Sequence, residues 1–307
     1  MRHATPVRRH PGHHQPRDRH HRFSPRPPPP SDDLTPFVAH YWHVEWNLRE
    51  PYEQCVLPHP SVHMTFAPDG SSSVKGVIRE RFHQMLAGRG RVLGVLFHPG
   101  GFRPFLNAPL STVTDRTLDL ADVFGPAGPR LAENVLNAPD GAGMIALVDE
   151  FLRAVRPERD AVAEEVTGMV ALAAGDSGVV RVDDLAERLG VSARRLQRLF
   201  AEHVGVGPKW VIRRYRMHEA AERAGSGLTV DWTALAVELG YSDQAHFIRD
   251  FTNTVGMPPS QYARTVRDSG AESERRASAG GEGDSPGRRT AAETEGLRPS
   301  VHGSLRI

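Results

Sequence analysis

The feature that most constrains this chain is a segment of about twenty residues that occurs twice in its C-terminal half. Residues Val182–Phe200 read VDDLAERLGVSARRLQRLF, and residues Trp232–Phe251 read WTALAVELGYSDQAHFIRDF. Each copy begins with apolar residues at the i, i+3, i+4, i+7 spacing of a helix that buries one face. A glycine follows in each copy, Gly190 or Gly240, where a helix end needs a residue that tolerates positive φ. Each copy is therefore predicted to form two short helices joined by a tight turn.

The two copies match position by position, which indicates an internal repeat. One residue is inserted after Ser242, and beyond the insertion Arg249 and Phe251 repeat Arg198 and Phe200. The matched pairs before the insertion are Val182 and Trp232, Leu185 and Leu235, Ala186 and Ala236, Leu189 and Leu239, Gly190 and Gly240, and Ser192 and Ser242.

Capping residues and a helical spacer accompany the repeat. Ser192 and Ser242 are predicted to cap the second helix of each copy, and Asp231 the first helix of the second copy, because their side chains accept free N–H groups. The spacer PKWVIRRYRMHEAAERA begins at Pro208, which suits a first helical turn. As a helix it would span roughly 25 Å, against about 34 Å for one turn of B-DNA. It could therefore set two helices in successive major grooves.

The outward face of each second helix is predicted to contact DNA. Arginine can bridge O6 and N7 of guanine, glutamine can do the same for adenine, and capped helix N-termini can hold phosphates. The competing interpretation is a solvated surface, or Arg198 and Arg249 paired with acids of the fold; the tandem arrangement favours DNA. The candidate DNA-binding residues are Ser192, Arg194, Arg195, Gln197 and Arg198, and then Ser242, Gln244, Ala245, His246 and Arg249.

Residues 165–267 resemble the DNA-binding domain of the AraC/XylS family of bacterial transcription regulators. The resemblance is carried by LAERLGVSARRLQRLF and by LAVELGYSDQAHFIRDFTNTVGMPPSQYAR, which closes with Gly256, Pro259 and Tyr262 of the family signature. It implies seven helices, with two helix-turn-helix units joined by a long helix. It also implies base contacts from Arg194, Gln197 and Arg198, and from Ala245 and Arg249.

The two reading faces differ in chemistry. Ala245 can offer a base only an apolar contact, for example to a thymine methyl group. The second unit is therefore expected to contribute more to phosphate binding than to base reading.

The N-terminal half is richer in strand signals. Phe37–Trp46 and Arg91–Phe102 read as strands, as do EQCVLPH, VHMTFAP and SSVKGVI. Short helices are expected at LDLADVFG, PRLAENVLN and MIALVDEFLRAV. Residues 34–137 resemble an uncharacterised cupin-like domain that precedes such DNA readers. The fold class is therefore α+β with two domains, a small β-barrel or cupin-like domain with short helices and an all-α domain.

The predicted domain boundary lies near Pro157, which breaks a helix. Residues 34–157 would form an effector or dimerisation domain, and residues 158–267 the DNA-binding domain. Residues 1–33 and 268–307 are predicted to be disordered tails, because they are poor in aromatic residues and low in complexity. The first is rich in histidine, so it could bind metal, remain solvated, or reflect a start codon placed too early.

The sequence argues against several other classes of protein. Cys55 is the only cysteine, which excludes an internal disulfide and a multi-cysteine zinc site. No apolar run approaches the roughly 20 residues of a membrane span, and the N-terminus has no signal-peptide core. We expect a cytoplasmic, nucleoid-associated protein with no cofactor and no metal. Six histidines are ligands by type, but their spacing matches no metal motif: His40, His43, His59, His63, His83 and His98.

The leading hypothesis is a transcription regulator, not an enzyme, whose N-terminal domain senses a small molecule or a partner. Double-stranded DNA is the predicted partner, and RNA polymerase and a second copy of the chain are further candidates. The alternative is a metal-dependent cupin enzyme that carries a DNA-binding tether. One group of aromatic residues could line an effector pocket or fill the core, and the core is favoured: Phe37, Tyr41, Trp42, Trp46, Phe66 and Phe97.

Overall fold

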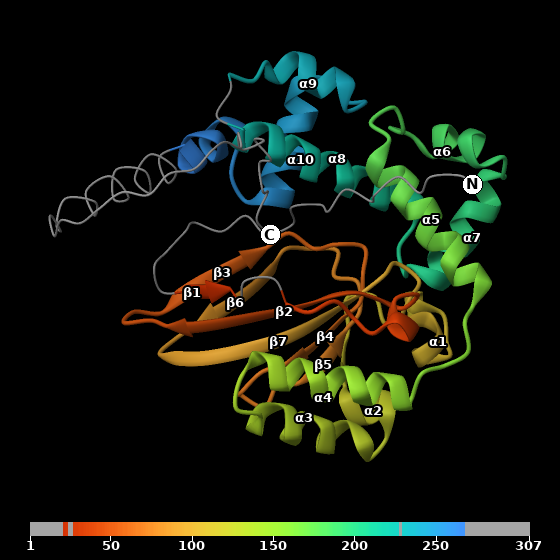
Figure 1. The fold of residues 1–307 in the computed structure, drawn as a ribbon. Helices are drawn as coiled ribbons and strands as arrows, with labels where there is room; N and C mark the ends of the chain where they lie inside the picture. Colours follow the sequence, from red (N-terminus) through yellow and green to blue (C-terminus); the bar gives the residue numbers. More distant parts are fainter. Residues whose placement is uncertain (1–20, 24–26, 227–228, 268–307) are drawn as a thin grey trace, which may run out of the picture.

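The computed structural model describes residues 21–23, 27–226 and 229–267, with a β-rich half below a helical half in Figure 1. The predicted tail at 268–307 and most of the predicted tail at 1–33 lie outside the described residues. Within those residues, no helix is long and apolar enough to cross a membrane.

The β-rich half contains a six-stranded antiparallel sheet and a separate two-stranded ribbon. The sheet order is β1-β2-β7-β4-β5-β8, so its two outer strands are not paired with each other. The sheet comprises β1 (His21–Phe23), β2 (Val38–Asn47), β4 (His63–Phe66), β5 (Ser73–Lys75), β7 (Arg89–Phe97) and β8 (Thr117–Asp119), and the ribbon pairs β3 (Tyr52–Val56) with β6 (Phe82–Leu86).

Two glycines of β7 make room for two tryptophans of β2. Trp42 is paired with Gly94, and Trp46 with Gly90. A Cβ atom on Gly94 would lie 2.0 Å from the Trp42 ring, and one on Gly90 would lie 2.3 Å from the Trp46 ring. The indoles therefore cover the backbone of the neighbouring strand, which a side chain on β7 would prevent.

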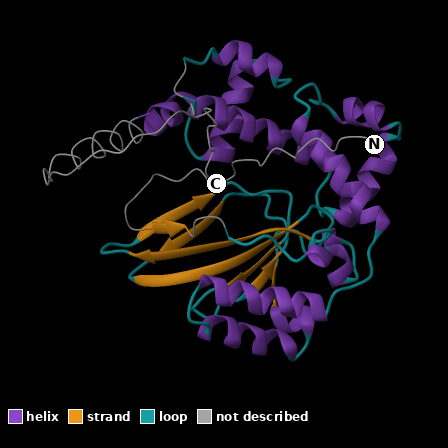
Figure 2. Ribbon diagram, in the orientation of Figure 1, coloured by secondary structure: helices purple, strands orange, loops and turns teal. Residues whose placement is uncertain are grey.

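Helices cover one face of this sheet (Figure 2). Their apolar sides and the sheet enclose a single core that includes Tyr41, Met64, Val95 and Phe97, all fully buried. Four of the six candidate pocket aromatics thus lie in the core, as the sequence favoured; Trp42 and Trp46 are half-buried. The helical segments are η1 (Asp32–Leu34), α1 (Arg103–Leu106), η2 (Leu110–Thr112), α2 (Leu120–Phe124), α3 (Ala127–Asn137) and α4 (Gly141–Ala154).

The packed chain begins before the predicted end of the first tail. The backbone N–H of Ser31 donates to Asp149 of α4 at 3.0 Å, and Tyr41 donates to the same carboxylate at 2.8 Å. Asp33 pairs with Arg156 at 2.6 Å. Residues 31–33 are therefore part of the fold, because acidic and hydroxyl side chains tie them to α4. Residues 21–23 also belong to it, since they pair with β2 as β1. The prediction of a disordered tail up to residue 33 is wrong for these two segments.

The helical half contains two hydrophobic cores that share one long helix. The first core includes Val166, Leu196 and Phe200, and the second includes Leu235 and Phe251. The N-terminal part of α8 packs on the first core and its C-terminal part on the second. The helices are α5 (Ala161–Gly175), α6 (Val182–Leu189), α7 (Ala193–His203), α8 (Pro208–Gly225), α9 (Trp232–Glu238), α10 (Gln244–Val255) and a last helical stretch at 259–267.

This architecture confirms the predicted α+β class, although among the described residues no pairing of β1 with β8 closes the sheet into the predicted barrel. The β-rich N-terminal half carries short helices, and the helical half contains two similar helix pairs joined by α8. With residues 259–267 included, the described part of the helical half matches the seven helices implied by the resemblance.

Candidate DNA-binding surface

The first unit consists of α6 and α7, and its local structure follows the sequence. Gly190 ends α6 with a positive φ of 64°. Ser192 caps α7, because its hydroxyl accepts the N–H of Arg195 at 3.2 Å. Leu196 and Phe200 point into the first core and are fully buried. The opposite face of α7 is therefore exposed to solvent.

Three predicted contact residues of α7 are exposed, with no hydrogen bond or ion pair from their side chains to the described part of the chain. Arg194, Gln197 and Arg198 all lie on the exposed face. Neither Arg194 nor Arg198 forms an ion pair or hydrogen bond with another described residue. Arg195 is also exposed, but it lies 3.5 Å from Glu165 of α5. The first unit therefore presents two guanidinium groups without an ion pair to a described residue, and a third, that of Arg195, which pairs with Glu165.

The second unit repeats this geometry with one correction at its cap. Ser242 was predicted to cap α10, but the cap is Asp243, whose carboxylate accepts the N–H of His246 at 2.7 Å. The inserted residue after Ser242 moves the start of the helix by one position. Ser242 instead donates to Asp243 at 3.3 Å. The hydrogen bond from the His246 backbone lowers the pKa of the Asp243 carboxyl, which keeps the cap ionised at neutral pH.

The exposed face of α10 carries fewer unpaired polar groups than that of α7. Ala245, His246 and Arg249 are exposed. Arg249 forms no ion pair or hydrogen bond with another described residue. Gln244 is half-buried, and its side-chain oxygen accepts the Thr233 hydroxyl at 3.1 Å, which holds it against α9.

The spacer helix uses its arginines to bond to other parts of the protein. Arg213 pairs with Asp250 of α10, which also accepts the Tyr241 hydroxyl at 2.8 Å. Arg216 is buried and donates to the Ala173 carbonyl at 2.8 Å. These bonds join the spacer helix to α10 and to α5, and Arg213 remains exposed while it pairs with Asp250. The 18 residues of α8 give it a length of about 27 Å.

The first unit is also joined to the β-rich half. Arg103 of α1 pairs with Glu202 of α7 at 2.9 Å, and the Thr114 hydroxyl donates to the Gly205 carbonyl at 2.6 Å. Gly205 has a φ of 92°, and a Cβ atom there would lie 2.9 Å from the Leu110 carbonyl oxygen. The C-terminal end of α7 therefore rests directly on the domain that precedes it.

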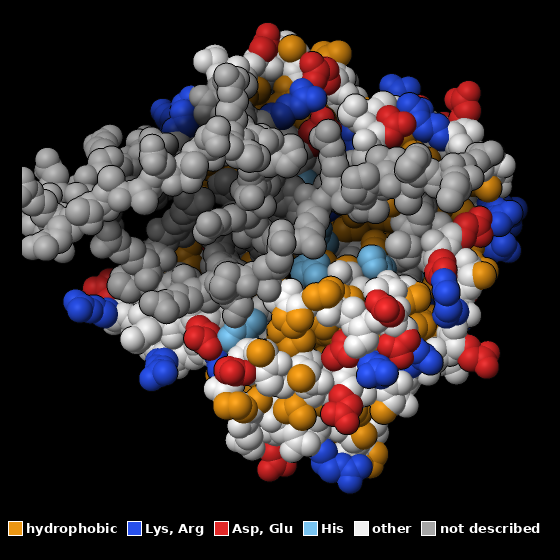
Figure 3. Space-filling view, in the orientation of Figure 1, with side chains coloured by type: hydrophobic (Ala, Val, Ile, Leu, Met, Phe, Trp, Pro, Cys, Tyr) orange, Lys and Arg blue, Asp and Glu red, His pale blue; other side chains and the backbone are white. Residues whose placement is uncertain are grey.

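The candidate metal ligands do not gather into one site. Histidine side chains are visible between the two halves in Figure 3. His59 stacks on His218 of α8 at 4.7 Å, His83 lies 3.2 Å from Glu53, and burial lowers the pKa of both His43 and His98. Among the described residues, no group of three His, Cys, Asp or Glu side chains is arranged to hold a metal ion.

Two family models match separate parts of this chain. Residues 27–119 match a domain of unknown function, and residues 185–265 match a helix-turn-helix domain. The second match runs from within α6 through α7, the spacer and the second unit to the closing Tyr262, which packs edge-on against Phe251 at 5.7 Å.

Curated relatives are similar over the same C-terminal region. An uncharacterised helix-turn-helix transcriptional regulator of Haemophilus influenzae is 29% identical over 100 residues, which are 33% of this chain and 33% of that protein. A helix-turn-helix transcriptional regulator of Mycobacterium tuberculosis is 32% identical over 87 residues, 28% of this chain and 33% of that protein. The chain spans about a third of the length of these relatives.

Solved structures show a more distant likeness. The C-terminal domain of the response regulator yesN of Fusobacterium nucleatum aligns with 34% of this chain and 99% of its own, at 21% identity and a TM-score of 0.29. ToxT of Vibrio cholerae aligns with 80% of this chain and 98% of its own, at 12% identity and a TM-score of 0.34. Because these TM-scores are low, the two domains are assigned from the sequence matches alone. Residues 185–265 are an AraC-type helix-turn-helix domain, and residues 27–119 belong to a family of domains of unknown function.

Proposed function

We propose that this chain is a transcription regulator that binds duplex DNA sequence-specifically through both helix-turn-helix units. The observation that carries this proposal is the contrast between two sets of arginines. The arginines of α8 are bonded to other groups of the protein, as Arg213 and Arg216 illustrate. Arg194, Arg198 and Arg249 are exposed on α7 and α10 with no ion-pair partner among the described residues. Unpaired cations on two repeated helices suit an anionic, repeating polymer.

Base reading is proposed to centre on α7. Arg194, Gln197 and Arg198 can donate to base edges, and the capped N-terminus at Ser192 can face a phosphate. Arg195 lies beside Glu165, so it is the weaker candidate of the four. On α10 the proposed contacts come from Arg249, His246 and Ala245. Gln244 and Ser242 are proposed to lie where the N-terminus of α10 approaches the sugar-phosphate backbone of DNA. The second unit thus contributes mainly phosphate contacts.

The remaining roles belong to the same proposal. The residues before about 157 would form the domain that receives a small-molecule signal or a second copy of the chain, and residues 158–267 the DNA-binding domain. We propose a cytoplasmic regulator without catalytic activity. Binding to RNA polymerase and binding to a second copy of the chain stay predictions. Metal analysis of the purified full chain tests the enzyme alternative, because stoichiometric iron, zinc or manganese bound through several histidines would contradict the proposal.

Selection of binding sites from random duplex DNA, followed by hydroxyl-radical footprinting, tests the proposal directly. The full chain should protect two patches on one face of the duplex, about one helical turn apart. An Arg198→Ala/Arg249→Ala double variant should lose both patches. Arg130→Gln is the matched control, because Arg130 is an exposed arginine of α3 in the β-rich half. A single short footprint, or equal affinity for all sequences, would contradict the bipartite reader.

A further inference from the structure

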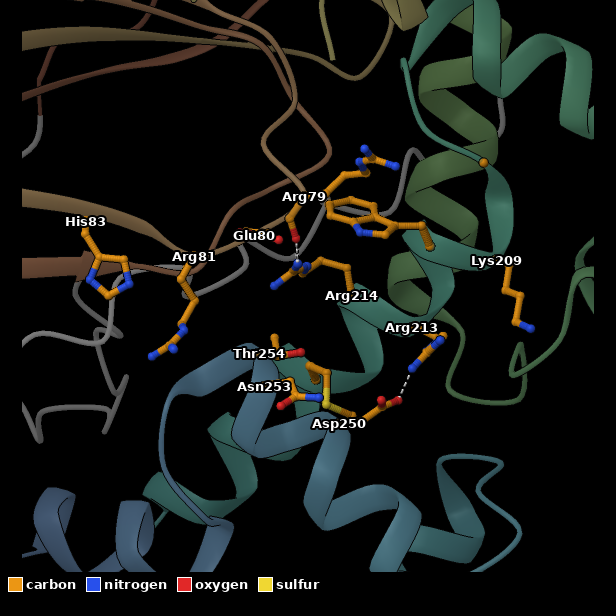
Figure 4. A pocket seen from close by; sticks show the side chains of 13 residues that line it. Arg79, Glu80, Arg81, His83, Lys209, Arg213, Arg214, Asp250, Asn253 and Thr254 are labelled. Atoms are coloured by element: carbon orange, nitrogen blue, oxygen red, sulfur yellow. Dashed lines mark hydrogen bonds and ion pairs between the residues drawn. The ribbon is translucent and has the colours of Figure 1, made fainter. Parts of the chain in front are cut away.

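A cleft lies between the β-rich half and the helical half, with a volume of about 860 Å³ (Figure 4). One side is formed by the segment that leads into β6, with Arg79 and Arg81. The other side is formed by α8 and α10, with Trp210, Arg214 and Met217 contributed by α8. Any ligand held here would touch both halves of the molecule.

Arg214 is the unusual residue of this cleft. Its exposed fraction is only 6%. One terminal nitrogen, Nη2, donates to the Arg79 carbonyl at 2.7 Å, and the guanidinium lies 4.7 Å from the centre of the Trp210 ring. The other terminal nitrogen, Nη1, is buried and has no hydrogen-bond partner among the described residues. No carboxylate of the described chain forms an ion pair with Arg214.

A buried charge without an acid partner is costly, because the carbonyl and the ring beside Arg214 replace only part of its hydration and no described acid supplies a counter-ion. Burial lowers the pKa of Arg214 to about 10, with no neighbouring acid to oppose the shift. The group is therefore still charged at neutral pH. An arginine in this position costs stability in the free protein, and an anion placed against Nη1 would offset that cost.

The acids that line the cleft do not offset this charge. Asp250 is bonded to Arg213 and to the Tyr241 hydroxyl. Glu80 is exposed and forms no ion pair with another described residue. Among the basic side chains of the lining, Arg79 pairs with Asp115 at 2.6 Å and His83 lies 3.2 Å from Glu53, whereas Arg81 and Lys209 form no ion pair with another described residue. The cleft thus has a net basic lining beside an aromatic and a thioether side chain.

We propose that this cleft binds a small organic carboxylate, with the carboxylate on Nη1 of Arg214 and the apolar body of the ligand against Trp210 and Met217. A guanidinium suits a carboxylate because its N–H groups lie in one plane. The flat ring and the thioether supply the apolar wall that a hydrocarbon body needs.

The same geometry connects the ligand to DNA reading, and this step rests on the proposed function. Arg81 reaches across from the β-rich half to the end of α10, where a Cβ atom on Gly256 would lie 2.0 Å from its guanidinium. A ligand between Arg81, α8 and α10 would therefore favour one placement of the second unit relative to the β-rich half. Since α8 also carries the first unit, ligand binding would set the spacing of the two reading helices.

The experiment measures thermal unfolding of the full chain with acetate, benzoate, 1-naphthoate and decanoate at constant ionic strength, with benzamide as the uncharged analogue of benzoate. At least one of the larger carboxylates should raise the Tm, benzamide should not, and Trp210 fluorescence should change in parallel. The Arg214→Gln variant should bind that carboxylate roughly tenfold more weakly or worse. Arg130→Gln should behave as wild type.

The Tm of the ligand-free variant separates a binding role from a structural one. If Arg214 awaits an anion, Arg214→Gln leaves the ligand-free Tm unchanged or raises it. A lower Tm in Arg214→Gln, together with no carboxylate shift in wild type, would overturn the proposal. DNA binding is measured separately in each variant without ligand, so carboxylate binding by a chain that binds no DNA would refute the proposed function and leave the cleft assignment standing.

Discussion

The two helix-turn-helix units share one pattern of helices but differ in what holds them. In the first unit, α7 packs against η2 of the β-rich half, and Glu202 pairs with Arg103. In the second, α10 is attached chiefly to α9 and α8, through its own core and the Asp250 pair with Arg213. It also meets the β-rich half where Arg81 approaches Gly256. One unit is fixed to the N-terminal domain, and the other is attached mainly to the spacer helix.

This difference shows what a sequence repeat specifies. The repeated positions are those that build each unit, such as Leu196 and Phe247 in the cores. The attachment residues are not repeated, because Glu202 and Asp250 stand at different places in the two units. Duplicated folds can therefore take unequal roles. In the proposed regulator, the fixed unit reads bases and the other unit responds to the cleft between the halves.

The largest expected effect comes from shortening a side chain in the second core, which should destabilise one unit and not the other. Phe251→Ala should cost about 3–5 kcal/mol of stability, because it leaves a cavity where a fully buried ring packs on Phe247 and Tyr262. Because the second core is distinct from the first, hydrogen exchange should quicken in α9 and α10 and stay slow in α6 and α7. Equal loss of protection in both units would show that they unfold together.

The next effect distinguishes the two reading faces. Arg198→Ala should weaken specific DNA binding by about 1–3 kcal/mol and relax preference at one base pair. Arg249→Ala should weaken specific and nonspecific DNA more evenly, because the second unit is proposed to contact phosphate. Titrations with a selected site and with a scrambled duplex measure both ratios. The reverse pattern would move base reading to α10.

Much of each unit could be predicted from local sequence. The caps at Ser192 and Asp231 and the positive φ at Gly190 were predicted correctly, because each depends on neighbours within about three residues. The predicted strands near β2 and β7 were also found, because both have strand-like patterns. The short β1, β6 and β8 were not predicted, since few residues define them.

The features that were missed depend on tertiary contacts. Asp243 replaces Ser242 as the cap because the inserted residue changes the helix start. The arginines of α8 look alike in sequence, yet Arg213 forms an ion pair with a carboxylate, whereas Arg214 forms none with a described residue. Their difference arises from residues far along the chain, since Arg214 meets the Arg79 carbonyl 135 positions away. No local pattern could have identified the cleft.

A smaller effect tests the attachment of the first unit. The Arg103–Glu202 pair is partly exposed on both sides, so a double-mutant cycle with Arg103→Gln and Glu202→Gln should give a coupling of about 0.2–1 kcal/mol. Chemical denaturation of the four proteins measures it. The same cycle on Arg213 and Asp250 gives the matching value for the second unit. A zero coupling at Arg103–Glu202 would show that the η2 packing and the Thr114 hydrogen bond, not this ion pair, hold the first unit.

The smallest effect concerns the cap of α10. Asp243→Ala should lower the Tm by a few degrees, whereas Ser242→Ala should have almost no effect, because only Asp243 accepts the His246 N–H. The pKa of Asp243 is lower in the folded protein, so its stabilising effect is present above its usual pKa of 3.8 and is lost as the pH falls through the lower folded value. Asp243→Asn can still cap but cannot titrate, so it should retain the Tm at pH 7 and lose part of the acid dependence. If Ser242→Ala were the more damaging change, the repeat would be in register at this cap after all, and the two units would begin their second helices at equivalent residues.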